Sequence, residues 1–219
     1  LSHLAQAATA AQDVDRPATR NVVIELFYRS DSDQSLKSKE FLEDLQKRRP
    51  GIEVKTYDML KDKPQLKRLL QLTKQFGHKK PGLPSIYLCN TLQLGFRDAK
   101  TTGAQIEGLL TINAYIRPGC KHCKAGKKFL DSMVLRYPAV QVVYHDVISD
   151  FNARNEVQRL ASQYRVQIPS FPCIQAGGRL FVGYQTDEIS GSKIEDLFVD
   201  RSVDISVEET KSPEKTEEQ

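Results

Sequence analysis

The sequence predicts an α/β protein made of two tandem copies of one fold, each with the element order β-α-β-α-β-β-α and a central mixed sheet flanked by helices. Three observations predict it. The chain repeats itself at a fixed offset, each copy alternates strand-type with helix-type patterns, and 219 residues suit two domains of roughly 100 residues. With 39% hydrophobic and 27% charged residues, the composition is typical of a globular protein.

The repeat has an offset of 88 residues. The stretch "FLEDLQKRRPGIEVKTYDML" (41–60) aligns with "FLDSMVLRYPAVQVVYHDVI" (129–148) without a gap, and "TGAQIEGLL" (102–110) aligns with "SGSKIEDLF" (190–198) at the same offset. Between these blocks, "GLPSIYL" (82–88) is similar to "QIPSFPC" (167–173), which predicts a short insertion here. Self-similarity in three ordered blocks indicates two copies of one structure.

The first three elements of each copy follow from local patterns. Branched and aromatic residues predict a first strand at 21–28 and at 111–116. Apolar residues at helical spacing then predict a helix that ends near Pro50 or Pro138, and a second strand follows at 52–59 or 140–147. The apolar face of the helix in the second copy is formed by Phe129, Leu130, Met133, Val134 and Tyr137.

The remaining elements complete the order. A second helix has apolar residues at Leu66, Leu69 and Leu70 in the first copy, and a strand begins at each X-Pro-Ser. A short strand at 92–96 or 179–184 and a last helix follow. We expect the first two strands to be parallel, because a crossover helix joins them, and the last two to be antiparallel.

These elements divide the chain into four segments: a leader or linker (1–20), a first domain (21–110), a second domain (111–200) and a disordered charged tail (201–219). Almost no residues separate the two copies, so we expect them to pack closely. The leader contains the A-x-A patterns of signal-peptide cleavage sites; an extracytoplasmic protein with a membrane anchor outside this chain and a cytoplasmic protein both fit it. A net charge of +4 is too small to indicate a nucleic-acid partner.

The chemistry of the chain centres on "CKHC", where Cys120 and Cys123 open the first helix of the second copy. The unpaired N–H groups and the positive end of a helix favour a thiolate. Lys121, His122 and Lys124 add positive charge, so we assign them to tuning of the thiol pKa. We expect Cys120 to be the nucleophile that attacks a disulfide, and Cys123 to resolve the mixed disulfide.

Other uses of these cysteines have requirements of their own. A zinc site needs four ligands, and Cys89 and Cys173 form no second pair, so both are expected in the core and no metal is predicted. Covalent haem attachment needs a histidine where Lys124 stands. A [2Fe–2S] cluster shared by two subunits, and a structural disulfide in a non-catalytic binding or chaperone module, stay open. The preferred hypothesis needs no cofactor beyond a redox-active Cys120–Cys123 disulfide.

The first copy has serines in place of the dithiol. Subtracting 88 from the cysteine positions gives Ser32 and Ser35, in "SDQS". Serine cannot form a disulfide, although Ser32 can still cap the helix. We therefore expect a redox-inactive first domain with a degenerate site, and an engineered pair of cysteine-to-serine changes is the alternative.

The element order, with C-x-x-C opening a helix and X-Pro before the third strand, resembles the thioredoxin superfamily over residues 20–200. Within it, "CKHC", "IPSFP" and "GRLFVGYQTDEI" are similar to glutaredoxin-like members. The tandem arrangement with cysteines only in the second copy resembles the N-terminal domain of the alkyl hydroperoxide reductase flavoprotein and tandem protein-disulfide oxidoreductases.

This resemblance implies a thiol–disulfide oxidoreductase that exchanges disulfides with protein partners or transfers electrons to them. Its redox partner would be membrane-bound or a flavoprotein. By the same resemblance, Ile168 and Pro169 form the cis-proline segment that binds substrate opposite the dithiol, with Pro84 as the counterpart of Pro169 in the first copy. The sequence departs from the family pattern at Gly119, which replaces the tryptophan found before the dithiol in thioredoxins, and at Ala114, where many have a buried aspartate.

Overall fold

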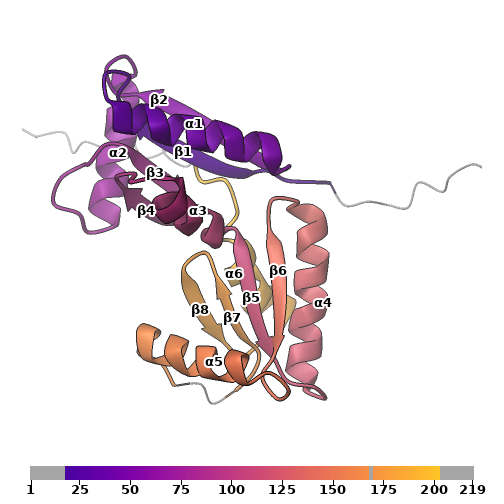
Figure 1. Cartoon of the computed structure of the whole chain (residues 1–219). Helices are drawn as coiled ribbons and strands as arrows, with labels where there is room; N and C mark the ends of the chain where they lie inside the picture. The colour runs from indigo at the N-terminus through magenta and orange to yellow at the C-terminus, as the bar shows by residue number, and fades with distance from the viewer. Residues whose placement is uncertain (1–17, 168–169, 203–219) are drawn as a thin grey trace, which may run out of the picture.

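The computed structural model describes residues 18–167 and 170–202. Two four-stranded mixed sheets form two domains, one above the other in Figure 1, with strand orders β2-β1-β3-β4 and β6-β5-β7-β8. In each sheet the first two strands are parallel and the last two are antiparallel, as predicted. The predicted fold class, two tandem copies of one α/β fold, is confirmed.

The elements of the first copy are β1 (Val22–Tyr28), α1 (Asp33–Arg48), β2 (Ile52–Asp58), α2 (Lys63–Gln75), β3 (Ser85–Leu88), β4 (Thr91–Leu94), a wide π-helical turn η1 (Ala99–Gly103) and α3 (Ala104–Leu109). Those of the second copy are β5 (Thr111–Ile116), α4 (Lys121–Arg136), β6 (Gln141–Asp146), α5 (Phe151–Tyr164), β7 (Cys173–Ala176), β8 (Arg179–Val182), η2 (Asp187–Gly191) and α6 (Ser192–Glu195). Each copy has the predicted order β-α-β-α-β-β-α.

The offset of 88 continues through the segment where an insertion was expected. β3 begins at Ser85 and β7 at Cys173, and the prolines that precede them, Pro84 and Pro172, both follow cis peptide bonds. The insertion predicted from Leu-Pro-Ser and Ile-Pro-Ser was therefore wrong. Pro84 is the structural counterpart of Pro172.

The last helix of each copy starts with a wide turn that lies close to an aromatic ring. The N–H of Gly103 donates to the carbonyl of Asp98, and that of Gly191 donates to the carbonyl of Thr186, five residues back in both cases. A Cβ on Gly191 would lie 2.6 Å from Phe129, a separation that real Cβ atoms do not tolerate. Glycine at this position lets the wide turn pack against α4.

The two domains are packed together, as predicted. One hydrophobic cluster contains residues of both, including Ile24 and Leu42 of the first and Ile112 and Leu130 of the second. Arg49, which follows α1, donates to the carbonyl oxygens of Ala139 (2.7 Å) and Leu110 (3.1 Å). Each domain thus completes backbone hydrogen bonds or core contacts of the other.

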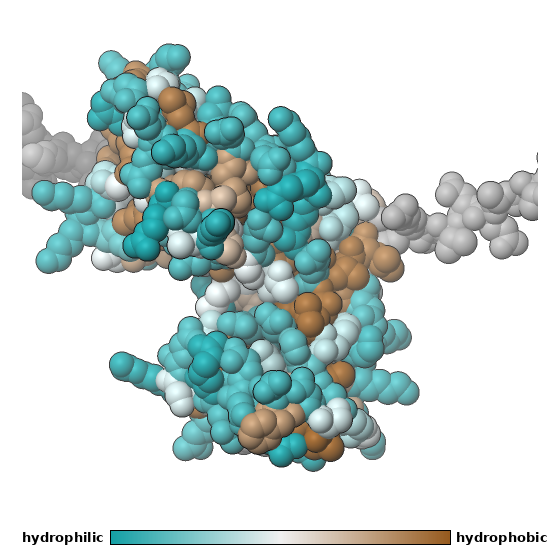
Figure 2. Space-filling view, in the orientation of Figure 1, coloured by the Kyte–Doolittle hydropathy of each residue, from teal (hydrophilic) through white to brown (hydrophobic). Residues whose placement is uncertain are grey.

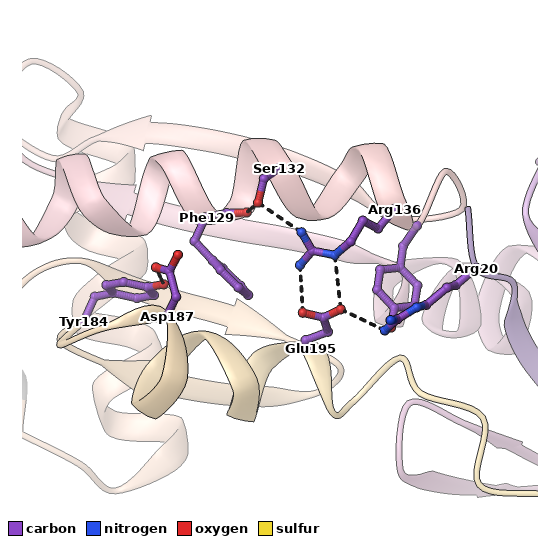
Figure 3. A network of polar contacts seen from close by, with 8 residues as sticks. Arg20, Phe129, Ser132, Arg136, Tyr184, Asp187 and Glu195 are labelled. Carbon is purple, nitrogen blue, oxygen red and sulfur yellow. Dashed lines mark hydrogen bonds and ion pairs between the residues drawn. The ribbon is translucent and has the colours of Figure 1, made fainter. Parts of the chain in front are cut away.

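A polar network ties the end of α4 to Arg20, which lies just before β1, and to α6 (Figure 3). Arg136 donates to both carboxylate oxygens of Glu195 (3.3 and 2.7 Å), and Arg20 donates to the same carboxylate and to the hydroxyl of Tyr137 (both 3.3 Å). The backbone N–H of Arg20 also donates to the carbonyl of Arg136. These contacts fix the end of α4 that is opposite the dithiol.

The dithiol end of α4 points away from the first domain. Figure 1 shows that α1 and α4 each begin at the end of their domain that is remote from the other domain. Both helix starts are therefore exposed at opposite ends of the molecule. Within 18–167 and 170–202, no helix has the length and apolar character needed to cross a membrane.

Candidate dithiol site

Cys120 is the N-cap residue of α4, as predicted. Its backbone is extended (φ −79°, ψ 119°), and its sulfur accepts a hydrogen bond from the backbone N–H of Cys123 at 3.2 Å. Gly119, with φ +73°, provides the left-handed turn that leads from β5 into the helix. Gly119 replaces the tryptophan of thioredoxins at this position. The turn here needs a positive φ, which glycine adopts readily.

The two thiols differ in access. Cys123 lies on the inner side of α4 and is 3% exposed, whereas Cys120 is partly exposed. Both are free thiols in this structure. An incoming disulfide can therefore reach Cys120 first, which agrees with the roles expected for a nucleophile and a resolving cysteine.

The surroundings of the two thiols also give them different pKa values. Burial raises the pKa of Cys120, but hydrogen bonds from the Cys123 thiol and from the backbone N–H groups of Cys123 and His122, with the charge of Arg117, outweigh burial. The pKa of Cys120 therefore lies below its ordinary value. Burial and the hydrogen bond with Cys120 raise the pKa of Cys123 to about 11. Cys120 is therefore the more acidic of the two thiols.

Arg117 is a site residue that the sequence analysis did not identify. It is exposed, it lies three residues before Cys120, and its guanidinium lies 5.7 Å from the centre of the Phe171 ring. The only sequence signal was a cation just before the C-x-x-C segment. The predicted tuning residues Lys121 and Lys124 lie on the exposed outer face of α4, and their effect on the thiol pKa stays a prediction.

Phe171 and Pro172 occupy the position beside the dithiol. The thiol of Cys120 donates to the carbonyl oxygen of Phe171 at 3.7 Å, and Pro172 follows in the cis form. The predicted substrate-binding residues Ile168 and Pro169 lie outside the described residues. The position assigned to Pro169 opposite the dithiol is instead held by Pro172, because the repeat runs without an insertion.

His122 turns its ring toward β8 and the loop after it. Its Nδ1 lies 2.8 Å from the carbonyl oxygen of Tyr184. A carbonyl can only accept, so Nδ1 carries the hydrogen and Nε2 is left facing away from this bond. Tyr184 stands where glutaredoxins tend to have a second glycine, and its backbone here orients a residue of the C-x-x-C segment.

Two hollows flank Phe171. One is lined by His122, Ser170, Lys193 and the segment 180–185. The other is mainly apolar and is lined by Arg117 and by residues of α5 and the segment before it. A peptide that lay across Phe171 would thus meet Cys120 between a hollow of mixed polarity and an apolar one.

The first copy reproduces the geometry without the thiols. Ser32 caps α1 and accepts a hydrogen bond from the N–H of Ser35 at 3.4 Å. Ser35 is fully buried, and its hydroxyl has no hydrogen-bond partner among the described residues. Pro84 lies before β3 as Pro172 lies before β7. The fold of the site is retained, and its redox chemistry is not.

The other cysteines are buried, as expected of core residues. Cys173 begins β7 and is 0% exposed, and burial raises its pKa to about 12. Cys89 lies just after β3 with φ +50°, and burial raises its pKa far above the ordinary range. In the described part of the chain, no three His, Cys, Asp or Glu side chains come close enough together to hold a metal ion.

Comparison with known proteins agrees with this geometry. Residues 112–181, which contain the dithiol, match the glutaredoxin family model. The two four-stranded sheets show that both domains have thioredoxin-like folds, so the resemblance inferred from the sequence is confirmed. The glutaredoxin match supports a thiol–disulfide redox function for the second domain.

Several solved structures are similar to the chain. The N-terminal domain of alkylhydroperoxide reductase AhpF from Enterococcus faecalis is 14% identical, with 82% of this chain and 92% of that chain covered and a TM-score of 0.32. A protein disulfide oxidoreductase from Aeropyrum pernix is 15% identical, with 84% and 90% covered and a TM-score of 0.28. A thioredoxin-like protein is 27% identical over 39% of this chain and 95% of that chain, with a TM-score of 0.30. No curated protein matches the chain.

Proposed function

We propose that this chain is a thiol–disulfide oxidoreductase that exchanges disulfides with protein partners through Cys120 and Cys123. The second domain (111–200) carries the reaction, and the first domain (21–110) is a redox-inactive copy that packs against it. The observation that carries the proposal is the partly exposed sulfur of Cys120, held at the start of α4 by the N–H of Cys123. No cofactor beyond the dithiol is needed.

The reaction begins with the thiolate of Cys120. It attacks one sulfur of the partner's disulfide, so that a Cys120–partner bond forms and the partner's other sulfur leaves as a thiolate that takes a proton from water. Cys123 then loses its proton and attacks the Cys120 sulfur. The bond between Cys120 and the partner breaks, and the partner's second sulfur leaves as a thiolate that takes up the proton given up by Cys123. The partner's disulfide is thus reduced to two thiols, and the two electrons come from the oxidation of Cys120 and Cys123 to a disulfide.

The acidities of the two thiols suit this order. The hydrogen bond with Cys120 contributes to the raised pKa of Cys123 in the reduced dithiol. Once Cys120 is in a mixed disulfide, its thiolate charge is gone, and this contribution to the pKa of Cys123 is removed. Formation of the mixed disulfide therefore eases the ionisation that the second step requires.

Phe171 suits a role in holding the partner. Its carbonyl oxygen lies 3.7 Å from the Cys120 sulfur, and hollows lie on both of its sides. An extended partner segment could donate a backbone N–H to an acceptor at this position while its cysteine meets Cys120. The role of Ile168 and Pro169 in substrate binding stays a prediction.

The test compares single variants in reduction of insulin or of a model peptide disulfide. We expect Cys120→Ser to abolish turnover and Cys123→Ser to accumulate mixed disulfides that mass spectrometry assigns to Cys120. Cys89→Ala, which removes a buried cysteine of the first domain, is the matched control and should retain turnover. If Cys120→Ser and Cys123→Ser both behave like the parent protein, the dithiol is structural and the chain is a non-catalytic binding module.

The reduction potential of the pair would give the direction of transfer. A value near about −270 mV indicates a reductant, and one near about −120 mV indicates an oxidant. Trapping partners with the Cys123→Ser variant in extracts would then supply the redox partner, membrane-bound or flavoprotein, that the resemblance implies.

A further inference from the structure

Three lysines share the outer face of α4, next to the dithiol. Lys121, Lys124 and Lys128 are three and four residues apart, so they lie within about 60° of one another around the helix. All three are exposed, and together with Ala125, Lys127 and Asp131 they line a shallow depression on α4. In the space-filling view, hydrophilic side chains project from the lower part of the edge that α4 forms, and hydrophobic residues lie at its upper end (Figure 2).

These lysines have no carboxylate partners in the described part of the chain. The ion pairs that α4 makes there are those of Lys127 with Asp131 and of Arg136 with Glu195. Like charges three and four residues apart repel on a helix, and positive charge in the first turn opposes the helix dipole. Their placement therefore works against the stability of α4, and the fold does not account for it.

The first copy provides an internal comparison. At the positions 88 residues earlier, α1 has Asp33, Leu36 and Glu40. Asp33 lies in the first turn, where a negative charge suits the helix dipole. The same fold thus does without the lysines where the dithiol is absent. The positive charge on this helix face is therefore present in the copy that has the thiols and absent from the copy that has the same fold without them.

Tuning of the thiol pKa, predicted for Lys121 and Lys124, does not account for the whole face. The main effects that lower the pKa of Cys120 come from the hydrogen-bond donors of Cys123 and His122 and from the charge of Arg117. Lys128 is also two helical turns away from the sulfur. We therefore look for a role of these three lysines other than tuning of the thiol.

We propose that Lys121, Lys124 and Lys128 form a docking surface for an acidic segment of the partner protein that carries the disulfide. The proposal rests on the proposed function, because it names the partner of the same site. The surface runs about 10 Å along α4 from Lys121 to Lys128, at 1.5 Å per residue. An extended acidic polypeptide could contact the whole of this surface while its disulfide reaches Cys120. The lysines would attract this segment and orient it.

The test uses matched peptide disulfides and the reduced full chain. Three peptides carry the same disulfide flanked by glutamates, glutamines or lysines, and oxidised glutathione serves as a small anionic comparator. The second-order rate constant for attack by Cys120 is measured at low and high salt. The readout is the ratio of the glutamate to the glutamine rate constant, because any change in thiol reactivity enters both and cancels.

We expect this ratio to be on the order of 10 at low salt and to approach 1 at high salt. The triple variant Lys121→Gln/Lys124→Gln/Lys128→Gln should reduce the ratio to about 1 at low salt. The variant Lys37→Gln/Lys47→Gln/Lys100→Gln removes three exposed lysines from the first domain and should keep the parent ratio. Both triple variants have the same net charge. A difference between them therefore reflects the position of the lysines and not the total charge of the protein.

Three results would overturn the proposal. The first is equal attack on all three peptides by the parent protein, and the second is an equal loss of the ratio in both triple variants. The third is a rate advantage over the glutamine peptide that is as large and as salt-dependent for oxidised glutathione as for the glutamate peptide. This result would mean that the lysines bind a small anion and not an acidic polypeptide. Failure to attack any disulfide would instead contradict the proposed function itself.

Discussion

Ser32 and Cys120 occupy the same position in the two domains. Each caps the first helix of its copy and accepts a hydrogen bond from the backbone N–H three residues on, at 3.4 Å for Ser32 and 3.2 Å for Cys120. Capping thus explains why a polar or ionisable side chain is kept at this position in both copies, and only the sulfur adds redox chemistry.

Restoring thiols to the first copy tests this equivalence. In Ser32→Cys/Ser35→Cys, made in a Cys120→Ser/Cys123→Ser background, the new thiol at position 32 should cap α1. We expect it to react with iodoacetamide at neutral pH more slowly than Cys120 does, because Asp31 and Asp33 flank it and Arg29 is paired with Asp31. Equal reactivity would show that the helix start alone sets the thiol pKa.

Arg117 should contribute to the acidity of Cys120. Its charge favours the thiolate, so Arg117→Gln should raise the pKa of Cys120 and move the pH profile of alkylation upward. Arg179→Gln, which removes an exposed arginine from the start of β8, is the matched control and should leave the profile in place. An unchanged profile in Arg117→Gln would mean that the hydrogen bonds from the Cys123 thiol and the backbone N–H groups lower the pKa without Arg117.

The wide turn before α6 should tolerate no side chain at Gly191. A methyl group there would meet the Phe129 ring at 2.6 Å, so Gly191→Ala should lower the free energy of unfolding by about 1–3 kcal/mol. Gly108→Ala lies in α3 with open space around the new Cβ and should be neutral or slightly stabilising. Urea unfolding of both variants measures the difference, and equal midpoints would contradict the packing argument.

Arg49 should be important for the contact between the domains. Its loss leaves the carbonyl oxygens of Leu110 and Ala139 without this donor, so Arg49→Ala should cost about 1–3 kcal/mol. Arg97→Ala removes an exposed arginine of the first domain and should change stability by less than about 0.5 kcal/mol. A loss in Arg49→Ala no larger than in Arg97→Ala would mean that water replaces the guanidinium.

The repeat made most of the fold predictable from the sequence. An offset that recurs in ordered blocks constrains element order more strongly than local propensity does, and the cap position of Cys120 followed from the place of C-x-x-C at the end of a strand pattern. Local patterns were less reliable where burial depends on tertiary contacts. Leu66 and Leu70 are exposed on α2 although helical spacing placed them with the buried Leu69.

The cis-proline beside the dithiol was assigned to the wrong residue from the sequence. "IPSFP" contains two X-Pro pairs within five residues, and the shared Pro-Ser favoured the first of them. The offset of 88, applied without a gap, would have selected Pro172. Arg117 could not be found by a motif, because its effect depends on how the turn after β5 brings it near the sulfur.

The pH dependence of Cys120 alkylation tests the central claim most directly. In the reduced parent protein, the rate of reaction with iodoacetamide, assigned to Cys120 by mass spectrometry, should rise with pH and level off as the thiolate becomes fully formed. Because the folded protein lowers the pKa of Cys120, the half-maximal rate should fall below pH 8.5, the approximate midpoint for a free cysteine. A midpoint at or above that of a free cysteine would contradict the account.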